Sequence, residues 1–304
     1  MNTRTLVIGE ALIDIVHGHA SEDDSAASTP DRELVGGSPA NVAVGLARQG
    51  HDVHLLTRIG RDERGARIAE HVASSGAALT AASWTDAATS TARARLRADG
   101  SAEYEFDIDW TVGAPDLDGV DLVHTGSIAL FLEPGAATVR DTLRRAAGSQ
   151  RVTLDPNIRP ALIGDHDTAL QQFSEAARSA DLVKLSDEDA AWLYPELLPE
   201  QVLSEIATLG PRIVVMTRGG EGALALGPGG VAEVSALPVD VVDTIGAGDA
   251  YMASLISSVL DDPQLFESKS ALLRALRRAA VTAGLTVARA GANPPRRAEV
   301  DAAL

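Results

Sequence analysis

The chain has 304 residues and a formal charge of −17, from 26 basic and 43 acidic side chains, and no basic stripe typical of nucleic-acid binding is evident. Hydrophobic residues make up 45% of the chain, but no apolar run is long enough to span a membrane, and without cysteine no disulfide or thiolate metal site can form. Glu10 and Asp14 interrupt the first apolar run, unlike in a signal peptide, so we expect a cytoplasmic protein with neither nucleic-acid nor membrane partners.

In chain order, apolar strand patterns alternate with helical patterns. "TLVIGEALIDIV" predicts a strand, "PANVAVGLARQG" a helix ending at Gly50, "DVHLLTRIG" a second strand, and "RDERGARIAEHVASSG" a helix ending at Gly76. "DLVHTGSI", "RVTLDPN", "DLVKLS" and "RIVVMTRGG" predict four further buried strands. The alternation predicts one α/β domain, residues 1–304, with a mostly parallel sheet and helices on both faces. Ligands bind beyond the carboxyl ends of such strands, where we expect Asp14, Asn157, Ser186 and Arg218.

The segment "TSTARARLRADGSAEYEFDIDW" breaks this alternation, because its period of two predicts a β-hairpin. A three-residue loop over 99–101 would pair Arg97 with Glu103 and Arg93 with Asp107, whereas a two-residue turn would put the arginines on the aromatic face. Cross-strand charge matching favours the first register. The apolar face of the hairpin could pack on the core, form a dimer contact or close over a cleft, and we favour a lid; this face carries Leu96, Tyr104, Phe106 and Ile108.

The segment "DVVDTIGAGDAYMASLI", residues 240–256, places tiny residues directly before a predicted helix. Val241 and Val242 are typical of the end of an extended segment. Asp249 is a good helix N-cap, but capping does not explain the three small residues before it. Small residues let backbone N–H groups converge on an anion, and a carboxylate beside them can take the proton from an attacking hydroxyl. From this segment alone, capping and phosphoryl transfer remain equal alternatives.

Other nucleotide and hydrolase motifs are absent from the sequence. Only two lysines occur, Lys184 and Lys269, and no Gly-Lys pair exists, which excludes a P-loop. The protein-kinase motifs, the Gly-x-Ser-x-Gly elbow and His-Glu-x-x-His are missing too. Nucleotide phosphates would therefore need another binding device.

Two long segments resemble the signatures of one family. "GGSPANVAVGLARQGHDVHLLTRIG" is similar to the N-terminal signature of the PfkB, or ribokinase-like, carbohydrate kinases, and "DTIGAGDAYMASLI" to their C-terminal signature. "GEALID" and "RAGANPP" also fit, so the resemblance covers nearly the whole chain. It implies a ribokinase-like, Rossmann-like α/β fold with a small β lid, here at about 11–37 and 89–112. It also implies transfer of the γ-phosphoryl of ATP to a hydroxymethyl group of a small sugar or a nucleoside.

The resemblance implies roles for individual residues. Asp249 would be the catalytic base, and the amides of Gly246, Ala247, Gly248 and Asp249 would form an anion hole. On the sugar side it implies Asp14, Gly36, Gly37 and Asn41, whose carboxylate and amide suit paired hydrogen bonds with a diol. Without the signatures, Asp14 would be read as a strand-end carboxylate and Asn41 as a helix-start residue.

Further residues carry weaker implications. Arg159 would reach the substrate or a phosphate, unless it only forms a surface ion pair, and Phe106 of the hairpin would close on the sugar. The residues implied to bind the nucleotide are Ser186, Thr217, Gly219 and Gly222. A plain strand–turn–strand would explain the glycines equally well.

Two ions are also implied. Asp243 and the carbonyl of Ile245 match the family's monovalent-cation site, for which K⁺ is the expected ion; the alternative for Asp243 is an Asx turn. Mg²⁺ would accompany ATP, with Asp189 in its shell. Many members carry Asn-x-x-Glu there, whereas this chain has Ser186 and Asp189 in "VKLSDED", as fructokinase-like members often do.

"GEALIDIV", "GGSPANVA" and "DPNIRP" together resemble bacterial fructokinases most closely. We therefore expect an ATP-dependent carbohydrate kinase that acts on fructose. 2-Keto-3-deoxygluconate kinase, ribokinase and nucleoside kinase are alternatives within the family. A non-catalytic sugar or nucleotide sensor is the alternative from a different class, and the intact Asp249 and glycines argue against it. A homodimer formed through the lid is a further expectation.

Overall fold

The computed structural model describes residues 3–16, 32–96 and 102–304. Its main feature is a sheet of nine described strands in the order β15-β14-β13-β12-β11-β10-β1-β4-β6. Strands β6 to β13 of this order pair in parallel, whereas β14 and β15 add an antiparallel edge. The strands are β1 (Arg4–Ile8), β4 (Asp52–Leu56), β6 (Ala78–Leu79), β10 (Leu122–Gly126), β11 (Arg151–Asp155), β12 (Leu182–Ser186), β13 (Ile213–Thr217), β14 (Ala223–Gly227) and β15 (Gly230–Val234).

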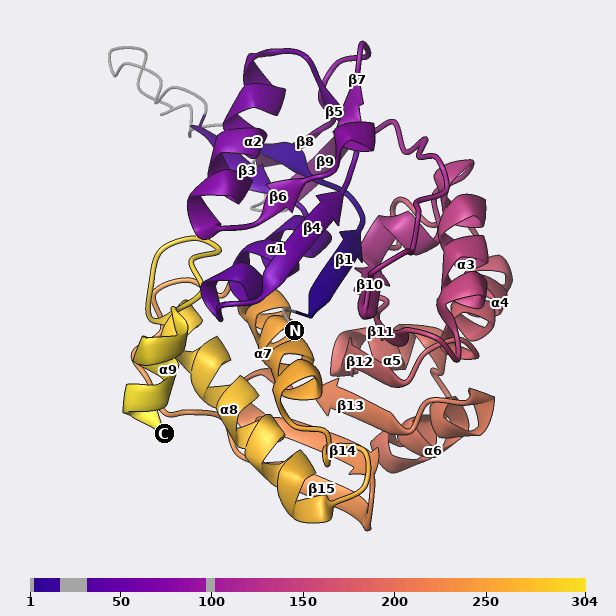
Figure 1. Ribbon diagram of the computed structural model, residues 1–304, viewed down its shortest axis with the longest axis vertical. Helices are drawn as coiled ribbons and strands as arrows, with labels where there is room; N and C mark the ends of the chain where they lie inside the picture. Colours follow the sequence, from indigo (N-terminus) through magenta and orange to yellow (C-terminus); the bar gives the residue numbers. More distant parts are fainter. Residues whose placement is uncertain (1–2, 17–31, 97–101) are drawn as a thin grey trace.

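Helices cover both faces of this sheet, as predicted, and Figure 1 shows the two layers on opposite sides of the strands. Consecutive strand residues face opposite ways: Val7 packs in the core under α1, α7 and α8, whereas Leu6 and Ile8 pack in the core under α3, α4 and α6. A strand buried on both faces needs a continuous apolar run, which explains the sequence pattern. The helices are α1 (Ser38–Arg48), α2 (Glu63–Ser75), α3 (Gly135–Ala146), α4 (His166–Ala177), α5 (Asp187–Leu193), α6 (Pro199–Leu209), α7 (Ala247–Asp261), α8 (Lys269–Val287) and α9 (Arg297–Ala303), with short 3₁₀ turns η1 (Ala81–Ser83), η2 (Ser127–Leu130) and η3 (Gly219–Glu221).

The predicted ends of the first two helices are confirmed. Helix α2 ends at Gly76, which has a φ of 100°, a conformation that suits glycine at a helix C-terminus. Gly50, just past α1, has a φ of 93°. The prediction that Val241 and Val242 end an extended element is wrong, since both lie in an exposed loop before α7.

The prediction of one strand over "TLVIGEALIDIV" is also wrong. The chain leaves the large sheet after Ile8 and starts β2 (Leu12–Val16) in a second sheet, and the break lies at Gly9, Glu10 and Ala11. Asp14 consequently lies within β2 rather than at the end of a strand of the large sheet. Apolar residues continue past Ile8 because Leu12, Ile13 and Ile15 are buried in their own right.

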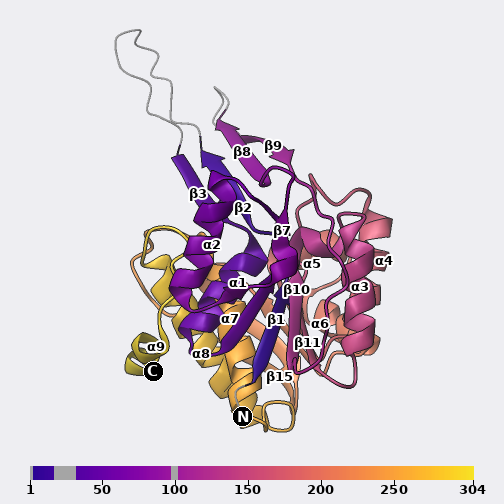
Figure 2. The same ribbon diagram turned by 45° about the horizontal axis from the view of Figure 1, so that its top comes forward.

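The second sheet has four described strands in the order β3-β2-β8-β9 and lies at one end of the molecule, beside α2 (Figure 2). It joins β2 to β3 (Arg32–Gly36), β8 (Thr91–Leu96) and β9 (Ala102–Asp107). A separate pair is formed by β5 (Ile59–Gly60) and β7 (Trp84–Thr85). The second sheet comes from the two segments, about 11–37 and 89–112, expected to form the lid.

The hairpin β8–β9 forms, but its predicted register is wrong by two residues. Arg93 pairs with Glu105 instead of Asp107, and Arg95 pairs with Glu103. The residues predicted for the turn, 99–101, lie outside the described part of the chain, as does the expected pairing of Arg97. A shift of two residues keeps every side chain on its face and still sets arginines opposite acidic residues, so charge matching does not distinguish the two registers.

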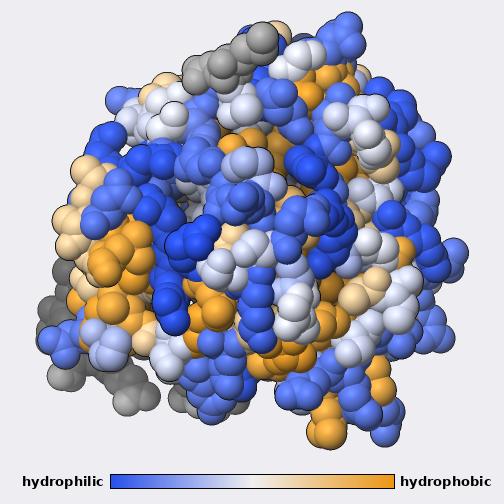
Figure 3. Space-filling view, turned by 60° about the horizontal axis from the view of Figure 1, so that its bottom comes forward, coloured by the Kyte–Doolittle hydropathy of each residue, from blue (hydrophilic) through white to orange (hydrophobic). Residues whose placement is uncertain are grey.

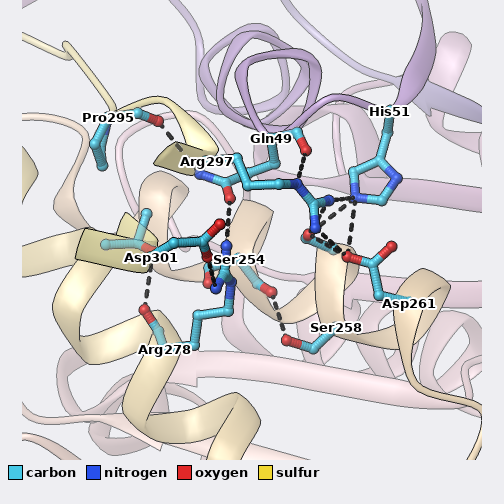
Figure 4. Close-up of polar contacts among 11 residues, drawn as sticks. Gln49, His51, Ser254, Ser258, Asp261, Arg278, Pro295, Arg297 and Asp301 are labelled. Atoms are coloured by element: carbon cyan, nitrogen blue, oxygen red, sulfur yellow. Dashed lines mark hydrogen bonds and ion pairs between the residues drawn. The ribbon is translucent and has the colours of Figure 1, made fainter. Parts of the chain in front are cut away.

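The C-terminal helix is tied to the body by a polar cluster, which we call the clasp and define by His51, Ser257, Asp261 and Arg297. Figure 4 shows His51, Asp261 and Arg297 of this cluster. Arg297 donates through Nε to the Gln49 carbonyl, through Nη1 to Asp261 Oδ2 at 2.7 Å, and through Nη2 to His51 Nε2 at 3.0 Å. Ser257 Oγ lies 2.9 Å from the same His51 nitrogen. One guanidinium therefore joins the start of α9 to the ends of α1 and α7.

On the face turned toward the viewer in Figure 3, hydrophobic groups are separated by hydrophilic residues. The helices in the described part of the chain are each too short or too polar to cross a membrane.

Candidate active site

A cavity of about 1260 Å³ opens between the carboxyl edge of the large sheet and the second sheet. Its floor receives one polar side chain from the end of each of five adjacent strands, β1, β10, β11, β12 and β13. This edge is where parallel sheets bind ligands. The volume exceeds the roughly 300–1,000 Å³ of usual small-molecule pockets, so two ligands could be held side by side. The five floor residues are Glu10, Ser127, Asn157, Ser186 and Thr217.

The second sheet and its hairpin supply the opposite wall. Asp14 of β2, Gly36 of β3 and Phe106 of β9 all line the cavity. Phe106 is half-buried rather than part of the core. Of the apolar face of the hairpin, Phe106 and Ile108 thus line the cavity.

Helix α7 points its N-terminus into the cavity. Gly246 is its N-cap, with a left-handed φ of 77°, and a Cβ there would collide with Ala292. The amides of the first turn have no acceptor within the helix, so they are available to an anion. Gly248 and Asp249 line the cavity together with Gly246. Ala247 does not, and its N–H lies 3.3 Å from the Thr244 carbonyl.

Asp249 is held by two side chains of the glycine-rich segment that starts α1. Ser38 Oγ donates to Asp249 Oδ1 at 2.6 Å, and Asn41 Nδ2 donates to Oδ2 at 2.8 Å. Burial raises the pKa of Asp249, although these bonds and the charges of Lys184 and Arg159 oppose the shift. The two signature segments, far apart in sequence, therefore meet at this carboxylate.

The residues predicted for sugar binding surround this point. Asp14, Gly36, Gly37 and Asn41 line the cavity, and burial raises the pKa of Asp14 against the charge of Arg159. A Cβ on Gly36 would displace the Asp14 carboxylate from its present position. A Cβ on Gly37 would collide with the Glu10 carbonyl, and its φ is 107°. The two glycines thus let the end of β3 pass close to residues 9–11, where the chain crosses from the large sheet to the second sheet.

Two floor residues have unusual backbones. Ser127 has a φ of 53° and Asn157 a φ of 38°, and among the described residues they alone combine a side chain with a positive φ. Such conformations cost free energy and cluster at functional sites. Arg159 follows two residues after Asn157, is exposed, lines the cavity and donates to the Ile158 carbonyl at 3.0 Å.

The residues predicted for nucleotide binding are only partly brought together. Ser186, Thr217 and Gly219 line the cavity. Gly222 does not; a Cβ there would collide with the Val234 carbonyl, which explains the glycine by strand packing. Arg218, expected at the end of a strand, pairs with Glu233 of β15 and lies outside the lining.

The two acidic residues predicted to bind ions accept hydrogen bonds from backbone N–H groups. Asp189 accepts from the N–H groups of Ser186 at 2.9 Å and Ile158 at 2.7 Å, which caps α5. Asp243 accepts from Ile245 N–H at 3.0 Å, forming an Asx turn, and from Gly291 N–H at 2.8 Å. These backbone bonds lower the pKa of Asp243. The described residues contain no cluster of three or more His, Cys, Asp or Glu side chains that could hold a metal ion.

Three buried charged residues escaped the sequence analysis. Glu10 lines the floor, its Oε2 has no hydrogen-bond partner, and burial raises its pKa to about 7. Lys184 and Asp155 form an ion pair of 2.8 Å beside Asp249. The scarcity of lysine was the available signal for Lys184. The interruption of the first apolar run was the signal for Glu10, whereas no comparable signal marked Asp155, because it lies in a segment that reads as a plain strand.

Comparison with known proteins gives concordant results. The family model described as pfkB family carbohydrate kinase matches residues 2–299. A fructokinase from Rhizobium leguminosarum bv. trifolii is 32% identical over 276 residues, covering 88% of this chain and 83% of the relative.

Two solved structures share the fold over almost the whole chain. Fructokinase from Xylella fastidiosa with bound ATP aligns with a TM-score of 0.83 at 24% identity, covering 99% of this chain and 98% of that one. A fructokinase double mutant from Vibrio cholerae, with fructose, ADP and potassium ion bound, aligns with a TM-score of 0.82 at 25% identity, covering 99% and 97%.

Proposed function

The chain belongs to the pfkB family of carbohydrate kinases, and we propose that it is an ATP-dependent fructokinase with Asp249 as its general base. One observation carries the assignment of the base. Asp249 is half-buried in the cavity lining at the N-terminus of α7, and Ser38 and Asn41 orient its carboxylate beside the first-turn amides. A positioned base next to an anion site is what phosphoryl transfer to a hydroxyl requires.

In the proposed reaction, the hydroxymethyl group of the sugar lies against Asp249. The carboxylate takes the hydroxyl proton as the oxygen attacks the γ-phosphorus and the bond to the β,γ-bridging oxygen of ATP breaks. A base is most effective when its pKa lies near the working pH, and burial moves the pKa of Asp249 in that direction. The amides of Gly246, Gly248 and Asp249 would hold the transferring phosphoryl group. Asp14 and Asn41 would bind the sugar hydroxyls.

Mg²⁺ would neutralise charge on the phosphates of the bound nucleotide. The backbone already uses both carboxylate oxygens of Asp189. The nucleotide phosphates and water would therefore supply most of the ligands, and a place for Asp189 in the outer shell remains part of the proposal.

Fructose is the proposed sugar because the Rhizobium fructokinase is 32% identical along most of both chains, and the Vibrio fructokinase structure holds fructose and ADP. Arg159 supports 2-keto-3-deoxygluconate as a second candidate, because its exposed guanidinium lines the cavity and could pair with a substrate carboxylate.

A coupled assay of ADP release over fructose, 2-keto-3-deoxygluconate, ribose, glucose and adenosine tests this proposal. We expect fructose to give the highest kcat/KM. A higher value for 2-keto-3-deoxygluconate would replace fructose by the second candidate. Binding of ATP without turnover of any compound would reject the kinase assignment in favour of a sensor.

A further inference from the structure

Lys184 reaches the anion site from below. It extends from β12 into the cavity floor, and its Nζ lies 3.1 Å from the position that a Cβ on Gly248 would occupy. Gly248 is in the first turn of α7, where the free amides are. Any side chain at Gly248 would crowd this ammonium. The glycine therefore leaves both the backbone amides and the lysine open to the same space.

Asp155 of β11 holds the ammonium in place. Lys184 Nζ and Asp155 Oδ2 are 2.8 Å apart, and the two side chains are 5% and 2% exposed. A buried ion pair contributes little net stability, because the cost of removing both charges from water offsets their attraction. An apolar pair would fill this place in the core equally well. The presence of the charged Lys184–Asp155 pair is therefore better explained by a role of its charge in ligand binding or catalysis than by stability.

The surroundings keep the lysine charged. Burial by itself lowers the pKa of Lys184, but the charges of Asp155, Asp189 and Asp249 outweigh it, and the net pKa is raised. Three carboxylates near one ammonium leave an excess of negative charge. A phosphoryl group entering the site would bring further negative charge, and direct contact with the Lys184 ammonium would offset it.

Hydrogen bonding in this region is incomplete. An ammonium has three donors, and the described residues provide Lys184 with one acceptor, Asp155 Oδ2. Asp155 Oδ1 is buried without a partner. Buried polar groups are normally paired, so unused donors beside an anion site point to a ligand that completes them.

We propose that Lys184 is a catalytic residue that donates a hydrogen bond to the phosphoryl group during its transfer. Asp155 is a positioning residue, since it acts only by holding the lysine. The inference rests on the proposed kinase function and adds a charged side chain to the backbone anion hole. Its contribution should be greatest in the transition state, where the transferring group is exchanged between ATP and the sugar.

Kinetics of three variants test this proposal. Lys184→Met should lower kcat about 10²–10³-fold, as the loss of one oxyanion donor does, while the sugar KM changes little. Because the single variant leaves Asp155 without its partner, Lys184→Met/Asp155→Asn removes both charges and should show the same loss at near-normal melting temperature. Lys269→Met is the matched control, since Lys269 is the other lysine of the chain and is exposed on α8. It should retain full activity.

A second measurement does not depend on turnover. Protein labelled with ¹⁵N at the lysine side chains has two Nζ sites, and Lys269→Arg identifies the Lys184 signal. Mg²⁺, ADP and aluminium fluoride, which mimic the transferring phosphoryl group, should shift the Lys184 signal and leave that of Lys269 in place.

Two results would overturn the proposal: normal kcat in the double variant, or an unmoved Lys184 signal in protein saturated with the mimic. Either could occur while wild-type protein phosphorylates fructose, which would leave the kinase function intact. Conversely, a shifted Lys184 signal with no sugar turned over would reject the fructokinase assignment but retain the contact with phosphate.

Discussion

The cavity floor and the clasp are both polar clusters inside the molecule, and they differ in how completely their groups are paired. In the clasp, Arg297 uses all three of its nitrogens on described partners. In the floor, Glu10 Oε2 is buried without a partner, and so is Oδ1 of Asp155, whose other carboxylate oxygen pairs with Lys184. A completed network stabilises one arrangement, whereas an incomplete one keeps donors and acceptors for a ligand. The difference separates a structural cluster from a candidate site.

The charges differ as well. The clasp sets one arginine against one aspartate, and burial lowers the pKa of His51, whose Nε2 lies 3.0 Å from Arg297 Nη2. The floor collects carboxylates around Lys184, and burial raises the pKa of Asp155 to about 6. Buried carboxylates of this kind lower the stability of the folded state, and we attribute their presence to ligand binding.

The largest expected effect comes from Asp249→Asn in the cavity, and Asp261→Asn in the clasp is its matched control. Asp249→Asn should lower kcat about 10²–10⁴-fold, because the base is lost. The fold should survive, since the new amide can accept from Asn41 and donate to Ser38 Oγ. Asp261→Asn in the clasp should leave kcat nearly unchanged and lower the melting temperature. Steady-state kinetics and thermal melts check both; near-normal turnover of Asp249→Asn would remove the base assignment.

Glu10→Gln tests how much ionisation of the buried Glu10 carboxyl group destabilises the folded protein. The pKa of Glu10 is raised from 4.5 to about 7, so its contribution to stability is fully present below pH 4.5 and is lost as the pH rises through 7. The loss amounts to about 3 kcal/mol at most. Glutamine cannot ionise, so the variant should melt several degrees above wild type at pH 8.5 and close to it at pH 4.5.

The exposed Glu196→Gln is the control for this effect and should follow wild type at both pH values. A difference between Glu10→Gln and wild type that does not change with pH would mean that Glu10 does not ionise in this range.

Arg297→Met tests the clasp. Several hydrogen bonds to a charged group are lost, so we expect about 2 kcal/mol lower stability to denaturant and unchanged kcat. Arg274→Met is the control, because its ion pair with Asp262 is an exposed one and should contribute under about 1 kcal/mol. Equal stability of the two variants would show that the clasp is no more than a surface network.

Phe106→Ser tests the wall opposite the floor, which we propose to be a lid. Because Phe106 is half-buried in the cavity lining, the sugar KM should rise about tenfold, or about 1.4 kcal/mol, with little change in melting temperature. Wasteful ATP hydrolysis should increase, because an open lid admits water. Phe173→Ser in the core is the contrast and should cost about 3 kcal/mol or more. A similar loss of stability in Phe106→Ser, at unchanged KM, would assign the hairpin to the core.

The smallest expected effect concerns K⁺ at Asp243 and the Ile245 carbonyl. Replacing tetramethylammonium by potassium should raise kcat about threefold, which is under about 1 kcal/mol. Since the Asp243 carboxylate already closes an Asx turn, equal rates in the two salts would assign it that structural role alone.

Local patterns in the sequence were sufficient for the class of fold and for the neighbourhood of the site. Apolar runs that alternate with amphipathic segments require a sheet covered on both faces, and Gly76 ends its helix because few other residues adopt its φ. The small residues before Asp249 are adjacent in the chain, so their amides converge wherever the helix is placed.

Other features were decided only by how distant segments pack. The break at Glu10 depends on which sheet each half of the apolar run joins, and the hairpin register depends on pairing that a two-residue shift leaves equally well matched. The pairing of Lys184 with Asp155 requires β11 and β12 to be neighbours in the sheet. Charge pairing and burial are properties of distance in space, which residue spacing along the chain does not specify until the order of the strands is known.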